Sequence, residues 1–95
     1  MKINSDGMFV DIHDSVRSIA DAETIVETLE KVKSLGVSEI EIRIHDSLTL
    51  PSNVIGYFLK LANSGIRVKL FIKNKTLLEL VEFLCMSDGI SIKSF

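Results

Sequence analysis

Three residue types used in nucleophilic catalysis stand side by side in the motif His45-Asp46-Ser47. The members of a catalytic triad normally converge from distant parts of a fold, so this adjacency is typical of a solvated loop at the end of a strand. His13 and His45 could both bind a metal ion, but no third or fourth ligand stands at a telling spacing. Cys85 lies in an apolar segment, where a free cysteine packs as a small buried residue. These residues therefore predict no enzyme, no metal site and no cofactor.

The segment TLPSNVIGYFLKLANSG, residues 49–65, offers a different chemistry, because its serine stands where a strand-like segment gives way to a helix. Ser52 has two alternative positions there. As the N-cap, it would accept a hydrogen bond from a backbone N–H near Val54 or Ile55. With Pro51 at the cap, Ser52 becomes the first helical residue, and its hydroxyl is free for a kinase. Proline is compatible with a helix entrance, because its missing N–H is not needed there.

Strand and helix patterns alternate along the chain and must position these residues. Apolar residues at every second position predict strands, and apolar residues at helical spacing predict helices. The expected strands are MKI, MFVDI, SEIEIRI, IRVKLFI and ISIKSF, and the expected helices cover about 21–35, 52–64 and 75–86. A turn at Asn4–Gly7 joins the first two strands, and a Thr76-x-x-Glu79 capping box opens the last helix.

This order of elements predicts an α/β fold. Strands that alternate with helices form a largely parallel sheet through right-handed crossovers. We expect a small, mixed and mostly parallel sheet of four to five strands, with three main helices packed mainly on one side. The chain has 95 residues and shows no linker or repeat, so we expect a single domain over residues 1–95.

The composition excludes several classes of function. The formal net charge is −2 and no basic stripe is present, so the sequence predicts no nucleic-acid binding. No apolar stretch approaches the roughly 18 residues that cross a membrane, which predicts no membrane insertion. The N-terminal residues lack the apolar run of a signal peptide, and the single cysteine forms no internal disulfide. We expect a cytoplasmic protein.

The second expected helix is apolar over an unusually wide arc. One stripe suits a core, and a second stripe contains Val54, Tyr57 and Leu61. The second stripe either packs against a neighbouring helix of the same domain or forms a partner-binding surface. We expect at least two residues of the set Leu50, Val54, Tyr57 and Leu61 to stay exposed beside Ser52. Such an apolar patch would also allow weak self-association.

Two stretches of the chain resemble the STAS domain, the fold of bacterial anti-sigma factor antagonists. EIEIRIHDSLTLPSNVIGYFLKLANSG resembles the strand, loop, Asp-Ser-x-Gly motif and helix of that family, and LLELVEFLCMSDGISI is similar to its last helix and ending. The resemblance implies a STAS-like fold and places Ser52 at the serine that a kinase partner phosphorylates. Gly56 keeps the spacing of a family glycine from that serine, which favours Ser52 as the first helical residue. Pro51 stands where the family has Asp, and Val54 where it has Gly.

The resemblance implies a regulatory module that binds a protein partner, either an anti-sigma factor or a serine kinase. Phosphorylation of Ser52 would switch this binding. The alternative is a STAS-like module that binds constitutively or serves as a structural subunit of a signalling or transport assembly, with Ser52 merely a helix cap. The expected partner-binding residues surround the start of the second helix: Leu50, Pro51, Ser52, Asn53, Val54, Tyr57 and Leu61.

Overall fold

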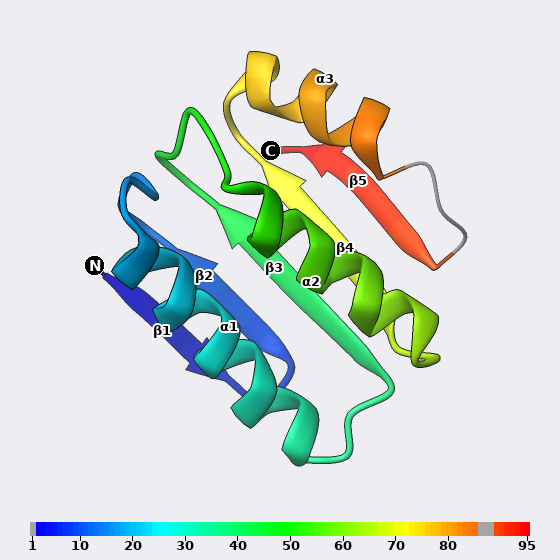
Figure 1. Ribbon diagram of the computed structural model, residues 1–95. Coiled ribbons are helices and arrows are strands. Elements are labelled where there is room, and N and C mark those ends of the chain that lie inside the picture. The colour runs from blue at the N-terminus through cyan, green and yellow to red at the C-terminus, as the bar shows by residue number, and fades with distance from the viewer. Residues whose placement is uncertain (1, 86–88) are drawn as a thin grey trace.

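Five strands form one mixed sheet in the computed structural model, which describes residues 2–85 and 89–95 (Figure 1). The strands follow one another across the sheet in the order β1-β2-β3-β4-β5. Only β1 and β2 pair antiparallel, and the other neighbours pair parallel. The elements are β1 (Ile3–Asp6), β2 (Phe9–Ile12), α1 (Ile19–Ser34), β3 (Glu39–Ile44), α2 (Ser52–Asn63), β4 (Arg67–Ile72), α3 (Lys75–Leu84) and β5 (Ile90–Ser94). The expected mixed, mostly parallel α/β sheet with three helices is confirmed.

All three helices lie on one face of the sheet (Figure 1). Each parallel crossover leads to the next strand in the same direction, and right-handed crossovers of this kind place every helix on the same side. Strand β3 shows the result, because Ile40, Ile42 and Ile44 are buried under the helices. The intervening Glu41 and Arg43 are only half-buried, on the opposite face of the sheet, which no helix of the described residues covers.

The hairpin of β1 and β2 turns later than the sequence predicts. Asp6 pairs with Phe9, so the loop consists of Gly7 and Met8 alone. The expected turn at Asn4–Gly7 is therefore wrong, since Asn4 and Asp6 are paired residues of β1. The physical reason lies in Gly7, whose φ of 59° is the left-handed conformation that a two-residue hairpin demands and that glycine adopts without strain.

The helix starts differ in how they are capped. At α1, the Ser18 hydroxyl accepts a hydrogen bond of 3.1 Å from the backbone N–H of Asp21. At α3, the Asn74 side chain accepts a hydrogen bond of 2.9 Å from the backbone N–H of Leu77. The predicted Thr76 cap is wrong, because the helix begins two residues earlier, where the Asn74 side chain caps it. The predicted helix end at Met86 lies outside the described residues.

The core fills the space between the sheet and the helices. Its largest fully buried side chains come from every layer and include Phe58 of α2 at 0 % exposure. Cys85 is 3 % exposed, as the apolar-residue interpretation predicts, and burial raises the pKa of its thiol. Further members are Ile12, Ile25, Leu29, Ile40, Ile42, Ile44, Leu61, Leu70, Ile72 and Leu77.

Candidate functional site

Ser52 is the first residue of α2. Pro51 occupies the N-cap with an extended backbone, φ −60° and ψ 147°, and contributes no side-chain hydrogen bond. The Pro51 carbonyl accepts from the N–H groups of Val54 at 3.0 Å and Ile55 at 3.3 Å. Ser52 itself is exposed, and its hydroxyl does not cap the helix. The second of the two predicted positions is therefore confirmed.

The apolar stripe beside Ser52 is mostly inside the molecule. Leu50 is 8 % exposed, and Val54 and Leu61 are 0 % exposed, so the expectation that at least two of the four residues stay exposed is wrong. Tyr57 is half-buried. The reason is packing within the molecule, because α1 contacts α2, and Val54 and Leu61 belong to the same buried core cluster as residues of α1. Burial, followed by the charge of Glu30 on α1, raises the pKa of the Tyr57 phenol.

The remaining predicted partner-binding residues line the surface where α1 and α2 meet. Asn53 is exposed and Pro51 is half-buried. Asn53 borders a groove of about 280 Å³, whose other lining residues come from α1 and are mainly acidic: Glu23, Val26, Glu27 and Glu30. Leu48 is 64 % exposed in the loop that precedes α2. The accessible surface around Ser52 is therefore polar and negatively charged, with a single large apolar side chain in the preceding loop.

The motif His45-Asp46-Ser47 does not form a catalytic triad. The Ser47 hydroxyl is buried in the loop. It accepts a hydrogen bond of 3.1 Å from the N–H of Val16 and donates one of 2.6 Å to the Thr49 carbonyl. Asp46 is exposed. Ser47 therefore fastens this loop to the segment before α1. The expected solvated loop is confirmed for Asp46 but is wrong for Ser47, which is 1 % exposed because its hydroxyl bonds two backbone groups.

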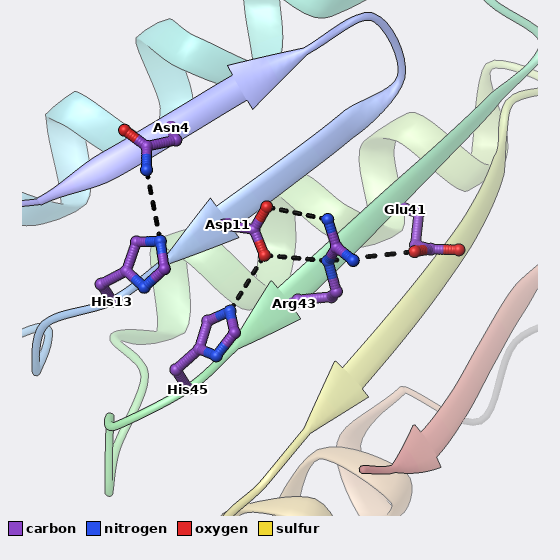
Figure 2. Close-up of polar contacts among 6 residues, drawn as sticks. All are labelled: Asn4, Asp11, His13, Glu41, Arg43 and His45. Carbon is purple, nitrogen blue, oxygen red and sulfur yellow. Dashed lines mark hydrogen bonds and ion pairs between the residues drawn. The ribbon is translucent and has the colours of Figure 1, made fainter.

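His45 instead joins a polar cluster on the open face of the sheet (Figure 2). Its Nε2 atom donates to Asp11 Oδ1 at 2.9 Å. Arg43 holds the same carboxylate, with Nη2 donating to Oδ2 at 2.9 Å and Nε lying 2.8 Å from Oδ1. Glu41 lies 4.0 Å from the Arg43 Nε on the other side. Asp11 thus stands between two donors on the neighbouring strand.

The pKa of Asp11 reflects these neighbours. Burial acts to raise it, but the hydrogen bonds from His45 and Arg43 and their charges outweigh burial and hold the pKa below the usual 3.8. Sequence reasoning missed Asp11. The available signal was the strand periodicity, since Asp11 and His13 are two residues apart, as are Arg43 and His45, and therefore share one face.

A polar hollow lies beside this cluster. It has a volume of about 460 Å³ and sits at the carboxyl ends of β2 and β3, where open parallel sheets commonly bind ligands. Its lining is entirely polar and belongs to the two loops that follow these strands and to the start of α1: His13, Asp14, Ser15, Arg17, Asp21 and Asp46. His13 belongs both to this hollow and to the open face.

Comparisons with protein-family models, with curated proteins and with solved structures find no match for this chain. The description of the site therefore depends on its own geometry. Two features define it: an exposed serine at the start of α2 beside an acidic groove, and a half-buried cluster of Asp11, Arg43, His13 and His45 on the uncovered sheet face.

Proposed function

We propose that the chain is a regulatory protein-interaction module of the STAS type, akin to bacterial anti-sigma factor antagonists, whose binding to a protein partner is set by phosphorylation of Ser52. The observation that carries this proposal is the position of Ser52, which is exposed, first in α2 and not used as a cap. The partner is an anti-sigma factor or serine kinase of the class that the sequence resemblance implies, and the module acts in the cytoplasm. No helix of the described residues is long and apolar enough to cross a membrane.

A phosphate at this position suits the helix. The first turn of α2 contains no acidic residue, and its N–H groups carry the positive end of the helix dipole. A phosphoserine adds nearly two negative charges, which such a terminus accommodates without unfolding. The charge therefore acts on the docked partner rather than on the fold.

The docking surface differs from the one that the sequence predicts. Leu50, Val54 and Leu61 are buried in the core and cannot contact a partner, so the prediction that they bind one is wrong. The surface that remains combines Ser52 and Asn53 with the acidic groove along α1. A basic segment of the partner matches this groove, because opposite charges across an interface raise both the association rate and the specificity. Phosphorylation of Ser52, the residue before Asn53, would add charge that must be desolvated when the partner docks.

The constitutive alternative has one specific observation in its favour. Pro51 stands where the family motif has Asp, and it fills the N-cap of α2 without a side-chain hydrogen bond. In this alternative, the module binds its partner at all times and Ser52 is only a helix residue.

The test begins with the intact mass of the protein isolated from its own cells, where a phosphoform supports the switch. The partner captured by the full chain is then titrated against wild type, Ser52→Ala and Ser52→Glu. Ser38→Glu is the matched control, because Ser38 is also exposed but lies at the opposite end of β3. We expect Ser52→Glu alone to weaken binding, by about 1 kcal/mol or more, because of repulsion at a desolvated contact. Equal affinities for all four proteins would refute the phosphorylation switch and favour the alternative of a module that binds constitutively.

A further inference from the structure

Two histidines and a carboxylate meet on the open face of the sheet (Figure 2). Asp11, His13 and His45 each offer one atom able to bind a metal, and these atoms all lie within 4.8 Å of one another. All three residues are half-buried. The two histidines could be seen in the sequence, whereas the third ligand appears only once the strands are paired.

The strand register produces this meeting. Ile12 pairs with Ile44 across the parallel strands β2 and β3, so His13 and His45 follow at the same level. Their rings stack at 4.6 Å between centroids with an interplanar angle of 16°. The ring of Phe95 packs edge-on against His45 at 5.1 Å, which restricts the orientation of that imidazole. The backbone therefore aligns the rings before any ligand binds.

The hydrogen bonds show how one nitrogen of each ring is used: His13 Nε2 faces Asn4 of β1, and His45 Nε2 faces Asp11. Asn4 Nδ2 lies 3.3 Å from His13 Nε2, and an amide nitrogen only donates, so this contact uses the Nε2 lone pair. His45 Nε2 lies 2.9 Å from Asp11 Oδ1, and a carboxylate only accepts, so this nitrogen carries a proton. A cation placed between His45 and Asp11 takes the place of that proton.

We propose that Asp11, His13 and His45 form a binding site for a divalent transition-metal ion of the zinc class. Imidazole nitrogen together with one carboxylate suits such ions, while calcium and magnesium prefer sites made entirely of oxygen. Three protein ligands leave at least one coordination position for water or a further ligand. Ligand atoms around tetrahedral zinc are about 3.3 Å apart. This spacing lies between the 2.9 Å that separates His45 Nε2 from Asp11 Oδ1 and the 4.8 Å within which all three ligand atoms lie, so small side-chain rotations are enough to bind the ion.

Arg43 opposes the ion. Its guanidinium already bonds Asp11, and its positive charge repels a cation bound to the same carboxylate. One carboxylate oxygen can bind the ion while Oδ2 keeps its bond to the Arg43 Nη2. Arg43 therefore limits the affinity and at the same time fixes the orientation of Asp11. This predicts opposite effects for variants within a single cluster, which a nonspecific surface site would not produce.

The experiment titrates the full chain with zinc by calorimetry and with cobalt by visible absorption. We expect one equivalent to bind wild type and Cys85→Ser alike, because the thiol is buried and outside the cluster. His13→Ala, His45→Ala and Asp11→Asn should each weaken binding at least about tenfold, and Arg43→Gln should strengthen it. Asp46→Asn is the control, since Asp46 is an exposed carboxylate next to His45 and outside the ligand set. Its affinity should equal that of wild type.

A measurement without substitutions guards against variants that fail to fold. The chain has two histidines, both in this cluster, so their ring resonances in nuclear magnetic resonance spectra report on the site directly. Zinc should shift both sets of ring signals at one equivalent. Wild type that binds no zinc at about 1 mM, ring signals that do not move, or binding lost in Cys85→Ser would overturn the proposal.

Discussion

The two serines at the starts of α1 and α2 allow a direct test of whether the Ser52 hydroxyl is free. Ser18 caps α1, because its hydroxyl accepts a hydrogen bond of 3.1 Å from the N–H of Asp21. At α2, Pro51 takes the cap position and Ser52 makes no capping hydrogen bond. Ser18→Ala should therefore cost about 0.5–2 kcal/mol of unfolding free energy, as for other N-cap serines. Ser52→Ala should change it by less than about 0.5 kcal/mol, since it removes an exposed hydroxyl without a structural role.

The expected difference is large enough to measure. In a domain of this size, 1 kcal/mol shifts the melting temperature by about 4–8 °C. Ser18→Ala should therefore melt clearly below wild type, whereas Ser52→Ala should melt at nearly the same temperature as wild type. Far-UV circular dichroism is the suitable probe, because the chain contains no tryptophan. Ser52→Glu should be neutral or stabilising by about 0.3–1 kcal/mol, through the helix dipole. If Ser52→Ala lost as much stability as Ser18→Ala, the hydroxyl would be a structural group and the switch proposal would lose its foundation.

Two further predictions concern the packing of the core and the stability of the protein at acidic pH. Phe58→Ala should cost about 3–5 kcal/mol, because Phe58 is 0 % exposed and its loss opens a cavity; a denaturant midpoint that barely moves at unchanged slope would contradict the packing described. The backbone hydrogen bond from Arg17, more than any other contact, lowers the pKa of Asp21 below 3.8, with burial opposing it. A lowered folded-state pKa means that this stabilisation is present above pH 3.8 and is lost as the pH falls through the folded-state pKa. Stability measured against pH should therefore fall less steeply for Asp21→Asn than for wild type in this range, and parallel curves would contradict it.

Patterns local in the sequence predicted the fold well. The alternation in 38–44 and 66–72 fixed which strand face is buried, and helical spacing located all three helices to within a few residues. Element order then implied parallel pairing and a one-sided arrangement of helices. Local competition explains the smaller errors, because Asn74 and Gly7 provide better cap and turn chemistry than the neighbouring residues that the sequence favoured.

The candidate site was harder to predict from the sequence than the fold, for a different reason. The polar cluster depends on the register between β2 and β3, which brings Asp11 to Arg43 and His45 over more than thirty residues of chain. No spacing rule along the sequence contains that register. The wide apolar arc of α2 was visible, but whether the same domain or a partner covers it is decided by packing, and packing within the molecule covers it.

The strand order has a consequence for how the chain folds as it is synthesised. Every strand after the first pairs with the strand made just before it, so the growing edge of the sheet is always the most recent one. No strand waits for a partner that has yet to leave the ribosome. After the hairpin of β1 and β2, each new strand pairing closes a segment of only one helix and its loops. The entropy lost in closing each such loop is modest, and the hydrophobic edge is exposed only until the next strand arrives. The molecule can therefore assemble from its N-terminal hairpin to β5 in the order of its own translation.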